Sequence, residues 1–363
     1  MIILIDGMLI TKPRGMGRYV YELLCSLNSK VNNDFKVIVY IPKNTSIDII
    51  NDLSNISFIY KKKWPFPIWE QFILPFYIMK TKCDIVHFPY NTKPLIFNIG
   101  LKKHVVTIHD MMFMESNSIF GKSIYQKLGN IYRKYIVKLM RLKSQHIITI
   151  SKYSQYMIKK YLGGNSDVVY TSMYIPSKVY KPIVKEKYFY HVGGISPHKN
   201  TERCINAFIK ANIEGYKLYI SGMPKESYLS KKYAQYNNIK FTGFLKQEEM
   251  YSMYANATAL IFPSLMEGFG LPITEAMMLD VPIITSNIPP MNEIAGNAAL
   301  LVNPYSEEEI VLAMRKVLNI NVRINILKYS RERRFLFSRF LMGKKMMNLY
   351  LKYMKNDVIV YKK

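Results

Sequence analysis

The chain has 363 residues, of which 49% are hydrophobic, and its mean hydropathy is −0.03. This length and composition exclude a mainly disordered or low-complexity chain and predict about two domains, because one domain usually has roughly 100–200 residues. The 51 Lys and Arg residues against 25 Asp and Glu residues give a net charge of +26, which indicates an anionic partner: nucleic acid, a phospholipid surface or a phosphorylated substrate.

Short apolar runs rich in β-branched and aromatic residues alternate with longer helical patterns along the whole chain. Such runs, apolar on both faces, predict parallel strands covered by helices and hence two α/β doubly wound domains. We expect strands at 1–5, 36–41, 56–60, 84–88, 104–109 and 146–150 in the first half. In the second half we expect them at 188–193, 217–221, 239–242, 258–262, 281–285 and 299–302.

The segment 176–187, with two prolines and no periodicity, is the expected joint between the domains. We expect a first domain at 1–178, a second at 179–330, and a helix within 331–363 that packs back on the first domain. The apolar start meets Asp6 early and lacks a basic leader region, so it predicts a buried strand and not a signal peptide. No apolar run approaches the roughly 18–20 residues of a membrane span.

The three cysteines are far apart and include no Cys-x-x-Cys pair. This spacing argues against a zinc site or a disulfide framework and favours a reducing compartment.

A glycine-containing segment follows the first expected strand and precedes an amphipathic helix. Gly15 and Gly17 would let backbone N–H groups approach a phosphate or sugar at the start of that helix. The third glycine of the dinucleotide-binding fingerprint is absent, so this segment alone fits a tight turn equally well.

The loop after the first strand of the second half holds Gly193, Gly194, His198 and Lys199 directly before a helix. A cation, bare backbone N–H groups and a helix start suit a phosphate group. The alternative is a surface lysine after a proline turn, and the glycine pair favours the phosphate site.

The segment 262–276, FPSLMEGFGLPITEA, is the strongest pattern in the sequence. Glu267 precedes a turn with Gly268 and Gly270, and Glu275 is expected in the first turn of the helix that follows. Carboxylates bind sugar hydroxyls, and exposed N–H groups suit a diphosphate. The alternative, in which Glu275 only complements the helix dipole, gives no reason for the two glycines.

EGFGLPITE resembles the Glu-x7-Glu motif of the family-4-type retaining glycosyltransferases, which have the GT-B fold. GMGRY, VTIHD, ISKYS, VGGISPHKN and FTGFL resemble further motifs of that family, in the same order. The resemblance extends from Ile2 to about Leu318 and includes bacterial mannosyltransferases of surface-polysaccharide (O-antigen) synthesis. It implies two Rossmann-like domains that face a deep cleft.

The resemblance also implies roles for individual residues. Lys199 would bind the donor diphosphate and stabilise the departing nucleotide, and Glu275 would hold the ribose hydroxyls. Glu267 would contact the transferred hexose, and His109 would reach the sugar from the first domain, by a hydrogen bond in preference to acting as a general base. The other donor-binding residues would be Gly15, Gly17, Gly194, His198, Gly243, Phe244, Leu245, Gly268, Phe269, Gly270 and Leu271.

Two positions depart from the family pattern. His198 stands where the family often has an arginine, which is always charged and binds in a bidentate manner. The segment 171–174, TSMY, stands where the family usually has Asn-Gly after the sixth strand.

No carboxylate stands out as a nucleophile, so we favour departure and attack on the same face of the sugar. There is no Asp-x-Asp pair, and we expect neither a metal nor another cofactor.

The segment 119–145 holds seven Lys and Arg residues and no Asp or Glu. We expect it to form a helix with its apolar stripe inward and its charges outward, toward an anionic bilayer or simply toward solvent. The segment 61–69 holds both tryptophans beside three lysines, a combination that suits contact with lipid headgroups, but we place Trp69 in the core. The expected inward stripe consists of Ile124, Leu128, Ile131, Tyr135 and Leu139.

The resemblance thus implies a metal-independent, retaining glycosyltransferase that moves a hexose from a nucleotide-sugar donor to a lipid-linked glycan or oligosaccharide. We expect it in the cytoplasm, peripheral on the inner face of the cell membrane. Mannose from GDP-mannose is favoured over a UDP-sugar or dTDP-sugar. A nucleic-acid-binding protein would use the positive charge but leaves the paired glutamates unexplained, so we expect no nucleic acid partner; a sugar-nucleotide epimerase of the same fold is a third hypothesis.

Overall fold

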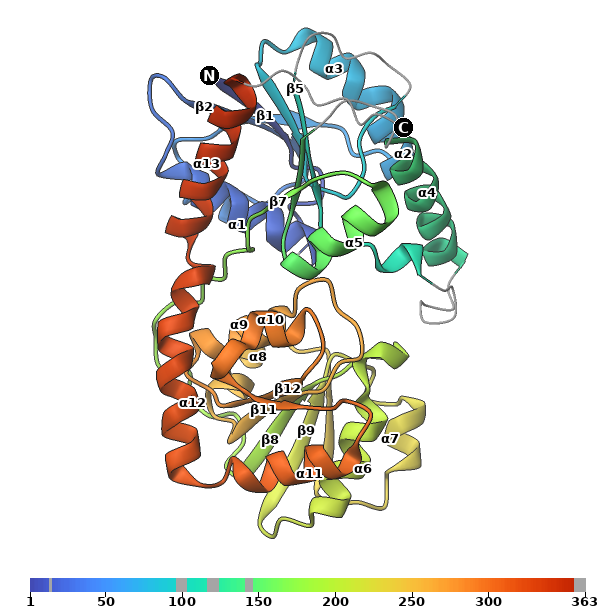
Figure 1. Ribbon diagram of the computed structural model, residues 1–363, viewed down its shortest axis with the longest axis vertical. Coiled ribbons are helices and arrows are strands. Elements are labelled where there is room, and N and C mark those ends of the chain that lie inside the picture. The colour runs from blue at the N-terminus through green and yellow to red at the C-terminus, as the bar shows by residue number, and fades with distance from the viewer. Residues whose placement is uncertain (13–14, 96–102, 116–123, 141–145, 356–363) are drawn as a thin grey trace. The chain divides into compact units, whose positions relative to one another are not determined.

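The structure is a computed structural model that describes residues 1–12, 15–95, 103–115, 124–140 and 146–355. The chain forms two compact units (Figure 1). The first consists of Met1–Ser172 together with Leu336–Lys363, and the second of Met173–Phe335. Both ends of the chain therefore belong to the first unit.

The first unit contains a seven-stranded parallel sheet in the order β3-β2-β1-β4-β5-β6-β7. The strand order reverses between β1 and β4, which is where open α/β sheets bind ligands. The sequence predicts six of these strands and misses β7, because two residues carry no readable pattern. The strands are β1 (Ile2–Asp6), β2 (Lys36–Pro42), β3 (Ser57–Lys61), β4 (Ile85–Phe88), β5 (Lys103–Ile108), β6 (His146–Thr149) and β7 (Asp167–Val168).

Helices lie on both faces of this sheet (Figure 1). The first begins after Gly15, whose φ of 58° and ψ of −130° are readily adopted only by glycine. The helical elements are α1 (Met16–Asn28), η1 (Ile47–Ile49), α2 (Phe66–Ile68), η2 (Trp69–Ile73), α3 (Leu74–Lys80), η3 (Met112–Met114), α4 (Ile124–Met140), α5 (Lys152–Leu162) and α13 (Arg339–Lys355).

The C-terminal helix α13 packs against α1, which confirms the predicted return to the first domain. Arg339 binds the fully buried carboxylate of Glu22 through two nitrogens, at 2.8 and 3.2 Å. Tyr350 makes a 2.7 Å hydrogen bond to His87 of the sheet. A Cβ on Gly343 would lie 2.1 Å from the carbonyl oxygen of Ser26, so only glycine allows this close approach of the helices.

The second unit contains a six-stranded parallel sheet in the order β10-β9-β8-β11-β12-β13. The order reverses between β8 and β11, so this unit is doubly wound like the first. All six strands overlap the apolar runs that the sequence predicts to be strands. They are β8 (Lys187–Val192), β9 (Tyr216–Ser221), β10 (Ile239–Gly243), β11 (Ala259–Phe262), β12 (Ile283–Ser286) and β13 (Leu300–Val302).

The helical elements of this unit also cover both faces of its sheet (Figure 1). Its core is apolar and includes Phe189, Ile205, Phe208 and Ile261, all at most 1% exposed. The elements are η4 (Pro197–Lys199), α6 (Thr201–Ala211), α7 (Tyr228–Lys232), α8 (Gln247–Ala255), α9 (Leu271–Met278), α10 (Met291–Ala295), η5 (Gly296–Ala298), α11 (Glu307–Lys316), α12 (Ile320–Arg333) and η6 (Arg334–Phe337).

The apolar stripe predicted for segment 119–145 does not face the core, and this expectation was wrong. Helix α4 covers Ile124–Met140, and 119–123 and 141–145 lie outside the described residues. Leu128, Ile131 and Tyr135 are 60–64% exposed. The core side is instead formed by Ile136, Val137 and Met140, while Leu139 is half-buried and the side chain of Ile124 is not described.

Among the residues that the structure describes, no helix combines the length and the apolar character needed to cross a bilayer.

Candidate functional site

The loops after β8 and β11 are joined to each other at the point where the strand order of the second sheet reverses. The carbonyl oxygen of His198 accepts the backbone N–H of Leu265 at 2.7 Å and the hydroxyl of Ser264 at 2.9 Å. Asn200, with φ of 56°, donates to the carbonyl of Pro263 at 2.9 Å. These bonds hold the lysine loop and the glutamate loop together as one structure.

Lys199 and Glu267 meet directly in this structure. The lysine Nζ lies 2.7 Å from Oε1 of Glu267, and the hydroxyl of Ser264 donates to the same oxygen at 2.8 Å. The two charged side chains keep 23% and 15% of their surface exposed. An anionic ligand can therefore approach the ammonium from solvent. Glu267, itself bound by Ser264, holds the ammonium in place.

Glu275 lies on α9, which begins after Gly270 with φ of 103°. The expectation that Glu275 belongs to the first helical turn was wrong, because that turn contains no acidic residue. Dipole complementation falls off beyond the first turn, so it does not account for the glutamate here. Its Oε2 accepts the hydroxyl of the fully buried Tyr254 at 2.8 Å, which fixes the carboxylate.

Glycines of the site allow close packing, either against a lysine side chain or between two backbone segments. A Cβ on Gly194 would lie 3.0 Å from Cγ of Lys199. Gly243, with φ of 81°, would bring a Cβ within 3.1 Å of Cγ of Lys225. The N–H of Gly222 donates to the carbonyl of Gly243 at 3.0 Å, so the loops after β9 and β10 also lie side by side. The predicted donor residues of the second unit thus line the carboxyl edge of one sheet.

The other residues of this edge differ in exposure. Phe269 is buried, Phe244 is largely exposed, and Gly268, Leu245 and Leu271 are half-buried. Burial lowers the pKa of His198, so its ring is neutral near pH 7 and does not replace the charge of an arginine at this position.

His109 belongs to the first unit and is buried. Its Nε2 donates to the carbonyl of Pro89 at 2.7 Å, and its ring packs edge-on against Tyr19. Burial lowers the pKa of His109 to about 4, so the imidazole is neutral near pH 7. The hydroxyl of Ser154 donates to the carbonyl of His109 at 2.8 Å. The backbone N–H of Ser154 donates to the hydroxyl of Ser151, which caps the start of α5.

Gly15 and Gly17 also lie in the first unit, and the structure gives each a local reason. A Cβ on Gly17 would lie 2.2 Å from the carbonyl oxygen of Lys12, so the turn itself excludes any side chain. Gly15 has open space around it but adopts a positive φ. The tight-turn interpretation of the sequence therefore accounts for Gly17 by itself.

Sequence reasoning missed the residues that hold the charged groups in place. Ser264 and Tyr254 are both fully buried and bind Glu267 and Glu275 respectively. The serine stands three residues before the Glu-x7-Glu motif, and the tyrosine lies in a helix whose pattern gives no sign of a partner.

A pair of buried carboxylates in the first unit was also missed. Burial raises the pKa of Asp6, at the end of β1, and of Glu70, on η2, each to about 7. Trp69 donates its Nε1–H to Asp6 at 3.1 Å, and Thr92 donates its hydroxyl to Glu70 at 2.5 Å. Tyr132 of α4 also hydrogen-bonds to Glu70.

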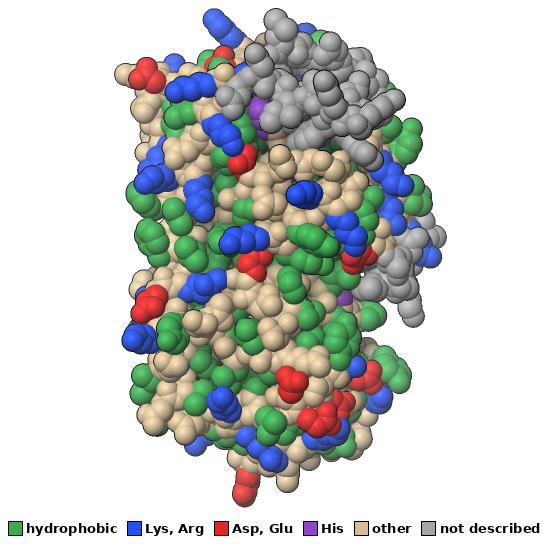
Figure 2. Space-filling model, in the orientation of Figure 1, with side chains coloured by type: hydrophobic (Ala, Val, Ile, Leu, Met, Phe, Trp, Pro, Cys, Tyr) green, Lys and Arg blue, Asp and Glu red, His purple; other side chains and the backbone are tan. Residues whose placement is uncertain are grey.

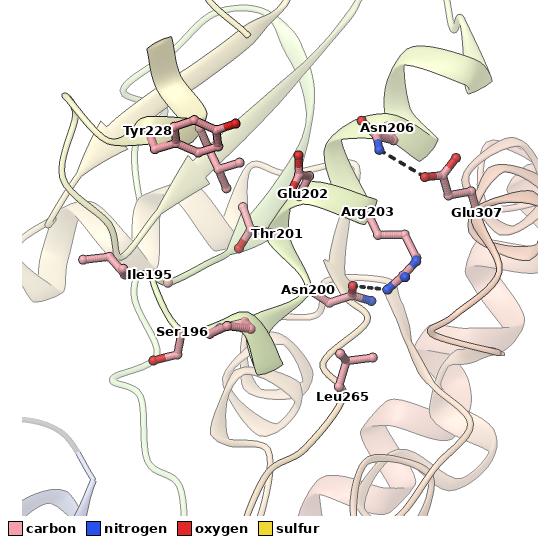
Figure 3. A pocket seen from close by; sticks show the side chains of 13 residues that line it. Ile195, Ser196, Asn200, Thr201, Glu202, Arg203, Asn206, Tyr228, Leu265 and Glu307 are labelled. Carbon is pink, nitrogen blue, oxygen red and sulfur yellow. Dashed lines mark hydrogen bonds between the residues drawn. The ribbon is translucent and has the colours of Figure 1, made fainter. Parts of the chain in front are cut away.

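A hollow of about 500 Å³ adjoins the lysine loop on the side of α6 (Figure 3). Thr201, Glu202 and Asn206 of α6 line it, together with Tyr228 and Glu307 (Figure 3). Of the predicted donor residues only Gly194 belongs to its lining. The charged pair of Lys199 and Glu267 lies outside this hollow, so the donor assignment depends on the loop edge.

Comparison with known families places one match on each unit. Residues 13–172 match the family described as Glycosyltransferase Family 4, and residues 177–333 match the family described as Glycosyl transferases group 1. The second match contains Lys199, Glu267 and Glu275.

Similar proteins include two that are named as mannosyltransferases. The O-antigen chain mannosyltransferase RfbU of Salmonella typhimurium is 27% identical over 329 residues, covering 84% of this chain and 87% of RfbU. The O-antigen chain mannosyltransferase B of Escherichia coli is 26% identical over 235 residues, which is 58% of this chain and 60% of that protein.

Among solved structures, Anabaena Alr3699/HepE in complex with UDP-glucose has a similar fold. It superposes with a TM-score of 0.69 at 16% identity, over 97% of this chain and 100% of that one. With two parallel-sheet Rossmann-like units and a match to each, the chain belongs to the family-4-type glycosyltransferases of GT-B fold.

Proposed function

We propose that this glycosyltransferase transfers mannose from GDP-mannose, with retention of configuration, to a lipid-linked or oligosaccharide acceptor of surface-polysaccharide synthesis. The observation that carries the proposal is the convergence of Lys199, Ser264 and Glu267 where the second sheet reverses its order. The choice of mannose is supported by the two mannosyltransferase relatives.

The chemistry of the proposed donor site follows from its charges. Lys199 binds the donor diphosphate and stabilises the negative charge that develops as the nucleotide leaves. Glu275, held by Tyr254, accepts hydrogen bonds from the ribose hydroxyls. Glu267 contacts the transferred sugar and, as an anion, stabilises positive charge at its reacting carbon. The contribution of His109 to sugar binding stays a prediction.

The proposed reaction uses no metal ion. Within the described ranges, no group of three or more His, Cys, Asp and Glu side chains is arranged to hold one. Lysine and backbone N–H groups at the starts of η4 and α9 supply the positive potential instead. The leaving diphosphate accepts the proton of the acceptor hydroxyl on the face from which it departs.

We propose that the protein acts at the inner face of the cell membrane, as a peripheral membrane protein. A lipid-linked acceptor and the bilayer around it are both anionic, and the net charge of +26 complements them.

The donor is identified by a thermal-unfolding panel with GDP-, UDP-, dTDP- and ADP-sugars. A ligand that binds only the folded protein at a hundredfold excess over its Kd stabilises it by about 2.7 kcal/mol. We expect the largest rise in Tm with GDP-mannose, and no rise with any donor in Lys199→Ala or Glu275→Ala.

Lys316→Ala, which removes an exposed lysine of α11, is the matched control and should respond like the unchanged protein. A selective rise with a UDP- or dTDP-sugar would replace the proposed donor. An undiminished rise in Lys199→Ala would remove that residue from the donor site.

A further inference from the structure

A row of large apolar side chains faces solvent along the segment that leads from β3 through α2 and η2 to α3. All five members are 39–54% exposed. From the second member on they are spaced four, four and three residues apart, which places them on one helical face. We call this row the apolar ridge; it consists of Trp64, Ile68, Phe72, Phe76 and Met79.

The ridge is not needed to attach this segment to the core. The opposite face of the same helical segment buries Trp69, Leu74 and Ile78, each at most 1% exposed. Single exposed apolar residues are common on protein surfaces, but a contiguous row of them indicates an interaction site.

Lysines border the ridge at both ends. The ammonium of Lys62 lies 5.0 Å from the ring centre of Trp64, and that of Lys80 lies 4.1 Å from the ring centre of Phe76. Between residues 61 and 82 the sequence has one acidic residue, Glu70, and its side chain is buried. Residues 61–82, all of which the structure describes, therefore combine exposed apolar side chains with positive charge and include no exposed carboxylate.

Helix α4, which contacts the segment η2, carries a second exposed apolar row. Tyr132 of α4 hydrogen-bonds to Gln71 of η2 at 2.9 Å and to Glu70, so the two helical segments are in contact. The exposed residues Leu128, Ile131 and Tyr135 lie on this helix, which has no acidic residue. Hydrophobic and basic side chains lie together along the margin of the first unit where α4 runs (Figure 2).

The charge of the protein is concentrated in the unit that carries these faces. Counted over the sequence, the first unit holds 31 Lys and Arg residues against 11 Asp and Glu, whereas the second holds 20 against 14. A bilayer containing anionic lipids attracts such a unit before any apolar contact forms.

We propose that the apolar ridge, with the adjoining face of α4, inserts into the headgroup region of an anionic lipid bilayer. The inference rests on the proposed work on a lipid-linked acceptor and names the face that makes the contact. Aromatic and aliphatic side chains enter the boundary between headgroups and acyl chains, while the bordering lysines extend to lipid phosphates. A partner protein would be expected to offer acids for these lysines and is the competing occupant.

The test is binding of the whole protein to vesicles, without donor or acceptor, so that its result does not depend on catalysis. Vesicles of phosphatidylglycerol and phosphatidylcholine are compared with phosphatidylcholine alone by co-sedimentation. We expect binding to the anionic vesicles, and binding weaker by roughly tenfold or more in Phe72→Ser/Phe76→Ser, because two large apolar contacts are lost.

The matched control is Leu312→Ser/Ile324→Ser, which removes two similarly exposed apolar side chains from the second unit and should bind like the unchanged protein. Trp64 supplies a second readout, because the other tryptophan, Trp69, is buried. We expect its fluorescence to shift to shorter wavelength with anionic vesicles, and the shift to disappear in Trp64→Phe.

Equal binding by Phe72→Ser/Phe76→Ser and the unchanged protein, or no binding to anionic vesicles, would overturn the proposal. A protein that sediments as a dimer, and as a monomer after the same double substitution, would assign the ridge to contact between copies and overturn it as well. The donor panel tests the proposed function separately, because the residues it examines lie in the other unit.

Discussion

Glu267 is the carboxylate on which the loops after β8 and β11 converge. Its Oε1 accepts both the Lys199 ammonium and the Ser264 hydroxyl. Lys199 therefore has an anionic partner in the absence of any ligand, and in the proposed function the diphosphate would be a second anion beside the same ammonium. The ammonium is already partly removed from water, so binding of an anionic ligand would require less further desolvation.

Tyr254 is expected to act as a positioning residue for Glu275. Tyr254→Phe removes only the hydroxyl that donates to the glutamate, and hydrogen bonds to charged groups contribute about 1.5–3 kcal/mol. We predict that KM for the donor rises by roughly tenfold or more while kcat changes less. The measurement is steady-state kinetics with varied donor.

Tyr188→Phe is the control for this substitution. It removes another buried tyrosine hydroxyl, which donates to the carbonyl of Met253 at 2.9 Å. We expect donor KM to be unchanged in this variant. Similar donor KM values in the two variants would contradict a positioning role for Tyr254.

The charged residues of the candidate site stand out in the sequence, whereas the residues that hold them in place do not. Lys199, Glu267 and Glu275 occur in glycine-containing segments after buried strands, a pattern that a sequence displays directly. The contact of Tyr254 with Glu275 joins α8 to α9, and no local pattern encodes which tyrosine of a helix reaches a given carboxylate.

At the scale of elements, buried strands were the most predictable features. Twelve apolar runs became the twelve longest strands, because a strand covered on both faces must be apolar throughout. Helix faces were less predictable. The apolar stripe of α4 satisfies helical spacing but is exposed, since a second set, Ile136, Val137 and Met140, packs against the core.

The segment η2 carries a buried carboxylate whose titration should be measurable. Because burial raises the pKa of Glu70 from 4.5 to about 7, the folded protein holds a proton there that the unfolded chain releases above about pH 4.5. This group therefore stabilises the fold less as pH rises from about 5 to 7. Each unit of pKa shift corresponds to about 1.4 kcal/mol.

We predict that Glu70→Gln becomes more stable relative to the unchanged protein as pH rises from 5 to 8. The measurement is the difference in urea-unfolding free energy between the two proteins at each pH. Taking the difference removes the opposite trend of His87 and His104, whose lowered pKa values reduce stability toward acid pH in both proteins. A difference that does not vary with pH would contradict the prediction.

At the scale of the whole molecule, the second unit is an insertion in the first. The chain leaves the first unit after Ser172 and re-enters it at Leu336. The segment that leaves and the segment that returns both bind the buried carboxylate of Glu22. The first does so through the hydroxyl of Ser172, at 3.2 Å, and the second through Arg339. One glutamate of α1 therefore anchors both connections.

A chain that stops after Phe337 is expected to retain a folded second unit and an unfolded first unit. It lacks the buried side chains of Met342, Met346 and Tyr350, each of which stabilises the fold by about 1.5–3 kcal/mol. Their sum approaches the 5–15 kcal/mol of a typical domain. Limited proteolysis should digest 1–172 and spare 173–335.

The control chain stops after Lys355 and keeps all of α13. We expect it to resist the protease in both units. Equal resistance of the two shortened chains would show that α13 is dispensable for the first unit.

The anchoring of α13 has a consequence for synthesis on the ribosome. The second unit has been fully translated before α13 of the first unit is made. The first unit therefore lacks this helix until translation reaches it. Until then the first unit lacks Arg339, which binds Glu22 in the finished protein, and Tyr350, which binds His87. We therefore expect the second unit to reach its native state before the first.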